Sequence, residues 1–208
     1  TAVSMNVTIT NTSASDVGGY VSVYPCGARP NVSNLNFVSG KTVPNAVLIP
    51  LSATGTVCFY VYGQADIIVD INGNFESELG YSPIAPNRIA DTRSVMGGIA
   101  ARPIGNTAGT GAPLEVSVVG TAGIPLSGVT AVSLNVTAIG ISTASSGGYL
   151  TVYPCDTRPN ASNLNFVAGQ TVPNAVIAPV SSRGTVCFYV YGIADIIVDA
   201  NGYISNIT

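Results

Sequence analysis

The side chains most able to do chemistry in this chain are its tyrosines, cysteines and aspartates. The 208 residues include ten tyrosines and four cysteines, but no histidine and no tryptophan. Without histidine, the usual general base and the usual partner of a Ser or Cys nucleophile are missing. We therefore expect a protein that is not an enzyme and that holds no cofactor.

Aspartate pairs are the remaining candidates for acid–base or metal chemistry. Asp66 and Asp70 lie four residues apart on a predicted strand, and the pattern recurs at Asp195 and Asp199. Residues at this spacing share a face but are about 13 Å apart, which is too far for a glycosidase pair. Asp70 followed by Asn72 resembles part of a calcium loop, but no glutamate follows at the EF-hand spacing. A different calcium site, or aspartates that bind loop backbone or an arginine, remain the alternatives, and we predict no metal.

The chain contains one long internal repeat. Residues 1–75 align without a gap with residues 130–204, and about 50 of the 75 aligned positions are identical. GTVCFYVYG at Gly55, for example, recurs unchanged at Gly184. We call each copy element B. The segment 83–129 occurs once and is called element A, so the order along the chain is B, A, B.

The repeat indicates how the cysteines pair. Cys26 and Cys58 lie in the first element B, and Cys155 and Cys187 occupy the same places in the second. Of the three possible pairings, the repeat favours one disulfide within each copy. Each bond closes a loop of about 33 residues and adds about 3–4 kcal/mol to the free energy of unfolding. The chain has no CxxC pair, so a zinc site is not expected.

Eight of the ten tyrosines fall into two equivalent clusters. Strand alternation places each cluster on the face that carries the cysteines, so the predicted disulfides bring the rings together. The clusters are Tyr20, Tyr24, Tyr60 and Tyr62 in the first copy, and Tyr149, Tyr153, Tyr189 and Tyr191 in the second. Three roles are open: the rings cover the disulfide, they form a packing surface between modules or subunits, or they bind a sugar.

Alternating apolar and polar side chains predict short β-strands throughout the chain. In the first element B the strand signals fall at 3–9, 21–23, 46–51, 57–61 and 67–71. Clusters of Gly, Pro and Asn separate them, and no segment has a helical period. We predict an all-β protein of tandem antiparallel β-sandwich or jelly-roll modules, each with one disulfide.

Element A adds two predicted strands, 88–93 and 114–119, joined by a Gly-rich loop. Residues 76–83 are interpreted as a linker. We predict a first module at 1–82 and a second at 83–208, in which element A precedes the second element B at 130–208. Arg88, Asp91 and Arg93 are expected to form a structural salt bridge that holds element A against element B.

Several motifs together resemble a repeat of secreted and cell-surface bacterial proteins. They are PNRIADTR at Pro86, GTAGIP at Gly120, AVSLNVTA at Ala131, GYLTVYPC at Gly148, RPNASNLNF at Arg158 and VDANGYI at Val198. The resemblance covers nearly the whole chain and implies an extracellular location and the order A before B. It implies no catalytic residue and no ligand.

The composition narrows the choice of partners. Only 8% of the residues are charged and the net charge is −3, with a single lysine at Lys41, so nucleic-acid binding is excluded. No apolar run is long enough to span a bilayer. A surface so poor in charge indicates either a Ser/Thr/Asn/Gly coat or burial against other copies. We expect an extracellular or cell-surface protein that binds copies of itself, with a cell-surface glycan as the alternative partner.

The order B, A, B leads to the boldest expectation. The first element B has no element A before it, so it lacks two strands and exposes a sheet edge or part of its core. A neighbouring copy that filled this gap would build an open, head-to-tail filament. Two alternatives compete: element A serves the first element B instead, or an upstream element A has been lost.

Overall fold

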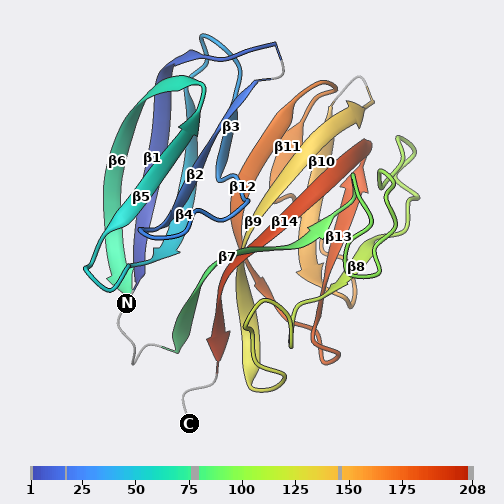
Figure 1. Ribbon diagram of the computed structural model, residues 1–208. Coiled ribbons are helices and arrows are strands. Elements are labelled where there is room, and N and C mark those ends of the chain that lie inside the picture. Colours follow the sequence, from blue (N-terminus) through green and yellow to red (C-terminus); the bar gives the residue numbers. More distant parts are fainter. Residues whose placement is uncertain (1, 17, 76–79, 145–146, 206–208) are drawn as a thin grey trace.

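The computed structural model describes residues 2–16, 18–75, 80–144 and 147–205 (Figure 1). These residues form β-strands in antiparallel sheets and no helix, which confirms the predicted all-β class. In the described part of the chain, therefore, no helix is long and apolar enough to cross a membrane.

The first element B forms two three-stranded sheets around a shared core. One sheet has the order β4-β1-β6 and the other the order β3-β2-β5. The strands are β1 (Ala2–Ser13), β2 (Gly19–Pro25), β3 (Leu35–Phe37), β4 (Val43–Pro50), β5 (Val57–Tyr62) and β6 (Gln64–Phe75). The alternating apolar side chains of both sheets meet between them, as at Val7, Val23 and Ile49.

The second element B repeats this arrangement and carries one more strand in each sheet. The orders are β12-β9-β14-β7 and β11-β10-β13-β8. The strands are β7 (Tyr81–Asp91), β8 (Leu114–Ser117), β9 (Val129–Ser142), β10 (Gly148–Pro154), β11 (Leu164–Phe166), β12 (Thr171–Pro179), β13 (Thr185–Tyr191) and β14 (Ile193–Ser205). The two extra strands, β7 and β8, both come from element A.

Element A closes one side of the second sandwich and leaves the same side of the first open. β7 pairs with β14 and β8 with β13, whereas the equivalent strands β6 and β5 pair only with β1 and β2 among the described residues. Val198 and Ala200 of β14 are both 0% exposed, but their counterparts Val69 and Ile71 in β6 are 39% and 73% exposed. Part of the first core therefore faces solvent.

β7 is longer than the strand predicted at 88–93. It begins at Tyr81, inside the segment that the sequence assigns to the linker, and pairs with β14 as far as Ile204. The first half of this strand was not predicted because it contains Pro83 and Pro86. Proline cannot donate a ladder hydrogen bond and therefore argues against a central strand. β7 is an edge strand, where the missing N–H groups are tolerated.

A small apolar cluster joins the two modules. With the first module taken from here on as strands β1–β6 and the second as β7–β14, Ala2, Leu48 and Phe75 of the first pack with Tyr81 and Ile204 of the second. The rings of Phe75 and Tyr81 are 5.0 Å apart. Tyr81 is 3% exposed. Its removal from water raises its pKa to about 12, because the charged phenolate loses its hydration there.

The buried Tyr81 predicts a loss of stability at alkaline pH. A tyrosine whose pKa is raised in the folded state contributes stability that is complete below pH ~10 and is lost as the pH rises towards about 12. We expect a loss of about 1 kcal/mol at pH ~11 relative to pH ~8. Urea unfolding at both pH values should show a loss that is about 1 kcal/mol smaller in Tyr81→Phe than in the wild type, because Tyr153 and Tyr189, whose pKa values burial also raises, contribute equally in both proteins. An equal loss in both proteins would assign it to other groups.

Candidate functional site

Both disulfides join the cysteines that the repeat pairs. Cys26 is bonded to Cys58 and Cys155 to Cys187, and in each case the two residues are 32 positions apart. Cys58 lies in β5 and Cys187 in β13, so each bond ties the end of β2 or β10 to its neighbouring strand. The bonds hold the tyrosine-bearing strands together from one end.

The tyrosine rings lie together as the alternation predicts. In the first module Tyr20 stacks on Tyr62 with ring centroids 5.3 Å apart, and Tyr60 lies 6.0 Å from Tyr20. The guanidinium of Arg29 lies 3.9 Å from the centroid of the Tyr60 ring, at cation–π distance. Tyr24 lies opposite Cys58 in the ladder.

The second module repeats the same geometry with small differences. Tyr149 stacks on Tyr191 at 5.3 Å and lies 6.1 Å from Tyr189, and Arg158 lies 3.7 Å above the Tyr189 ring. Tyr153 is 5% exposed and packs against the disulfide. Sequence reasoning missed the arginines. The signal was present, because RPN recurs at Arg29 and Arg158.

A loop of element A covers the second tyrosine face. The Tyr189 hydroxyl donates to the carbonyl of Gly109 at 2.8 Å, and the Gly192 N–H donates to the carbonyl of Asn106 at 3.0 Å. Gly109 has a φ of +74°, and a Cβ atom there would approach the Tyr191 ring to 3.1 Å, so both the turn and the close approach favour glycine.

No counterpart of this loop lies on the first tyrosine face among the described residues. Tyr62 is 47% exposed, and every residue of β5 is half-buried or exposed. Most of β13 is buried instead. The first module therefore presents an accessible plate of three tyrosines and one arginine.

Arg88, Asp91 and Arg93 form a linked ion-pair network. Arg93 lies 2.7 Å from Asp91, and Arg88 lies 3.4 Å from Asp91. Burial alone would raise the pKa of Asp91, but hydrogen bonds from Arg93 and the charges of both arginines lower it below its ordinary value. The network extends to Asp199 of β14, because Arg88 Nε donates to Asp199 Oδ1 at 2.9 Å. Arg88 thus binds element A to element B.

Asp199 is one of the aspartates for which the sequence left open a bond to loop backbone or to an arginine, and the structure pairs it with Arg88. It is 1% exposed, and burial raises its pKa even though Arg88 acts in the opposite direction. Asp195 accepts a 2.7 Å hydrogen bond from the hydroxyl of Thr92. On acidification, Asp199 should therefore take up a proton before Asp91 does.

The equivalent aspartates of the first module face solvent. Asp66 accepts a 2.6 Å hydrogen bond from the amide of Asn11, and Asp70 is exposed. The side chain of Asn72, which the calcium alternative requires, lies outside the described side chains. In the second copy the equivalent carboxylate, Asp199, forms an ion pair with Arg88, so it is already bound. Asp199 and Asp195 bind side chains of β7 and of the residue after it in the second module. Among the described residues, Asp70 and Asp66 of the first module have no such strand beside them.

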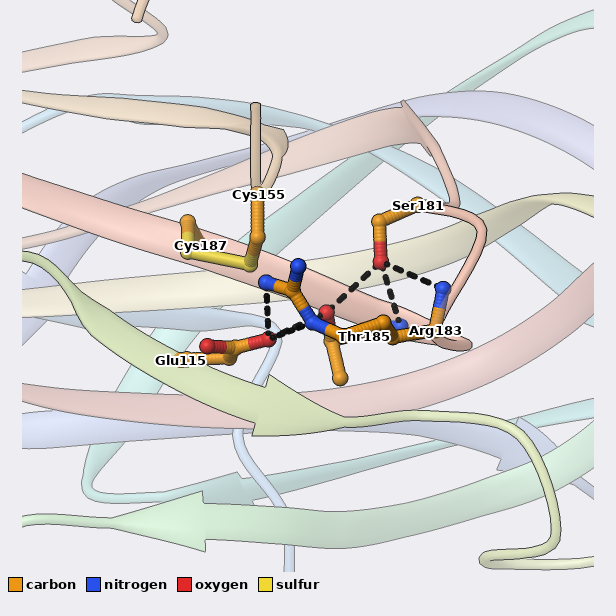
Figure 2. The surroundings of a disulfide bond; sticks show 6 residues. All are labelled: Glu115, Cys155, Ser181, Arg183, Thr185 and Cys187. Carbon is orange, nitrogen blue, oxygen red and sulfur yellow. Dashed lines mark hydrogen bonds and ion pairs between the residues drawn. A yellow bond between two sulfur atoms is a disulfide. The ribbon is translucent and has the colours of Figure 1, made fainter. Parts of the chain in front are cut away.

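Glu115, Cys155 and Cys187 lie close enough to suggest a metal site (Figure 2). The two sulfurs are joined in a disulfide, so neither is a thiolate ligand. Glu115 is bound to Arg183 at 2.8 Å and accepts a 2.7 Å hydrogen bond from Thr185. The hydrogen bond from Arg183 is the main cause that lowers the pKa of Glu115. The group therefore works as a structural clamp beside the disulfide.

Comparisons with family models, with curated proteins and with solved structures found no match for this chain. The resemblance to a bacterial surface-protein repeat accordingly stays a prediction. What the geometry itself displays is an uncovered side of the first module, made of the tyrosine plate, the β5 and β6 edges and part of the core. Two disulfide bonds are typical of proteins from an extracellular setting.

Proposed function

We propose that this chain is a non-enzymatic extracellular structural protein, a self-associating subunit of a surface filament, sheath or layer. The observation that carries the proposal is the open β5 and β6 side of the first module, which β8 and β7 close in the second. An open edge with apolar side chains is a site where another chain adds a strand. The element A within residues 1–208 pairs with the second module, so a strand that fills this edge is not that element A.

The open edge keeps the side chains that bind β7 in the second module. Asp70 corresponds to Asp199, the partner of Arg88, and Asp66 corresponds to Asp195, the partner of Thr92. Retention of both carboxylates favours a strand that places an arginine and a threonine at the spacing found in β7 and the residues after it. Low overall charge adds to the tendency to associate.

Light scattering tests the proposal directly. The purified chain should show a mean mass that rises with concentration in the micromolar range, and electron microscopy should show elongated assemblies. A synthetic peptide of residues 81–93 should lower the mean mass, because it occupies the β6 edge. The same peptide with Arg88→Ala and Thr92→Ala is the control and should have little effect. A mass that stays at one chain at every concentration would sink the proposal.

One observation favours a second candidate, a carbohydrate-binding or adhesion module. The stacked pair Tyr20 and Tyr62, with Arg29 beside it, forms an accessible aromatic plate in the first module alone. Aromatic faces with a polar rim suit the apolar face of a sugar ring. A glycan array separates the candidates: binding that Tyr62→Ala abolishes, by a chain that remains monomeric, would favour adhesion.

A further inference from the structure

The contact between the two modules of one chain is a polar lock. The side of the first module that carries β3 and β4 rests on the outer face of the sheet containing β12, β9 and β14 (Figure 1). Asn45 Nδ2 donates to Asn135 Oδ1 at 3.0 Å, and Asn45 Oδ1 accepts from the Ala175 N–H at 3.3 Å. Asn135 Nδ2 in turn donates to the Ser33 carbonyl at 2.8 Å. Asn45 is 4% exposed and Asn135 is 2% exposed.

Both halves of this lock occur twice in the chain. The half on the first module, here called the docking patch, is Val32, Ser33 and Asn45, and its second copy is Ala161, Ser162 and Asn174. The half on the second module, the docking face, is Asn135, Ala175, Ile197 and Asp199, and its second copy is Asn6, Ala46, Ile68 and Asp70. All the side chains that make the polar contacts are identical between the copies.

The unused docking patch is already shaped for the contact. Asn45 Nδ2 also donates to the Asn34 carbonyl at 2.7 Å, and this bond fixes its amide. In the second module Asn174 Nδ2 donates to the Asn163 carbonyl at 2.6 Å, so the equivalent amide is held in the same way. A preorganised amide loses little conformational entropy on binding.

The unused halves face solvent where the used halves are covered. Ile197 is 5% exposed in the lock, whereas Ile68 is 50% exposed on the first module. Val32 is 5% exposed in the lock, whereas Ala161 is exposed on the second module. The docking patch of the second module and the docking face of the first are therefore both free.

We infer that the docking patch of the second module binds the docking face of the first module in another copy of this chain, through the contacts that lock the two modules within one chain. The inference rests on the proposed self-association and adds this pair of surfaces to the open β5 and β6 edge, so that assembly needs both contacts. Asn174 then bonds to Asn6 and to the Ala46 N–H of the neighbour. Because the two surfaces differ and lie on different modules, the contact is heterologous and can repeat from one copy to the next.

The contact between copies is weaker than the lock within a chain. β7 carries Tyr81, which packs at the junction, and the described residues of the first module form no counterpart of this strand. Tethering within one chain also raises the effective concentration of the two halves to the millimolar range, which separate copies lack. Assembly through these surfaces is consequently concentration-dependent.

Two variants, each with one of the two free surfaces blocked by a charged side chain, test the inference. Ala161→Arg places a long cation on the docking patch, and Ile68→Arg places one on the docking face, and both positions are exposed in the single chain. Each variant alone should lose the growth of mean mass with concentration. An equimolar mixture should give a species of twice the mass of the 21.0 kDa chain, because each variant retains the surface that the other has lost. Val95→Arg, at a position that is 78% exposed and outside both surfaces, is the matched control and should assemble like the wild type.

The possible results separate the two proposals. Circular dichroism and urea unfolding first establish that the variants are folded. Folded variants that assemble like the wild type would overturn the docking inference and leave self-association through the β5 and β6 edges standing. Folded variants that remain single chains even when mixed would also contradict it. A wild type that never associates would remove both proposals.

Discussion

Replacing Arg88 by methionine should lower the free energy of unfolding of the second module by about 3–5 kcal/mol. Asp199 is 1% exposed and takes its ion pair from Arg88, so the substitution leaves a buried carboxylate without its cation. Asp91 is affected less, because it keeps the closer partner Arg93. Urea unfolding followed by tyrosine fluorescence and circular dichroism measures the loss.

Two further variants show that the loss comes from the uncompensated charge. Adding Asp199→Asn to Arg88→Met should restore a large part of the stability, because a neutral amide costs less to bury than an unpaired carboxylate. Asp70→Asn is the matched control: Asp70 is exposed, so the same change should alter stability by less than about 0.5 kcal/mol. A loss below about 1 kcal/mol in Arg88→Met would mean that the bridge does not hold element A in place.

Removing either disulfide should cost about 3–4 kcal/mol of unfolding free energy on the chain-entropy model. Both bonds span 32 positions, so the double variants Cys26→Ala/Cys58→Ala and Cys155→Ala/Cys187→Ala should lose similar amounts. Calorimetry of the two variants measures the losses. A difference of more than about 2 kcal/mol between them would show that strain or unfolded-state structure outweighs loop closure.

The two disulfides should differ in how fast they are reduced. In the second bond Cys187 is 4% exposed beneath the tyrosine cluster and its partner Cys155 is half-buried, whereas Cys26 and Cys58 are both half-buried and β8 does not cover their strands. Thiolate attack requires access to a sulfur atom, so limiting reductant should open the bond of Cys26 and Cys58 first. Alkylation and peptide mass mapping at short times identify the first bond to open, and earlier loss of the other bond would contradict this expectation.

The repeat made most of the fold accessible to sequence reasoning. Alternation at Val57, Phe59 and Val61 gives both the strand and its inward face, and the offset of 129 residues transfers each assignment to the second copy. β3 was missed because it has three residues, although Leu35 and Phe37 alternate with Asn36 and point into the core. A short strand of this kind carries too few residues to stand out by periodicity.

The partners across long sequence distances were harder to predict. The separation of Arg88 from Asp199 is 111 positions, and local pattern contains no information about which of several aspartates an arginine will face. The loop that covers Tyr189 through Gly109 is likewise an irregular Gly-rich segment without a period. Such contacts follow from which strand edges are adjacent, and adjacency depends on the whole topology.

Element A covers one side of the second sandwich and not of the first, so the same position of the repeat can be buried in one copy of element B and exposed in the other. Ala200 is packed in the closed core, whereas Ile71, at the same position of the repeat, is largely in solvent. A crossover between the two gene segments that carried Ile71 into the place of Ala200 would crowd that core, and overpacking destabilises a protein. Residues 55–70 nevertheless match residues 184–199 at 15 of 16 positions, so a barrier to such a crossover rests on few positions, of which Ile71 and Ala200 are one pair.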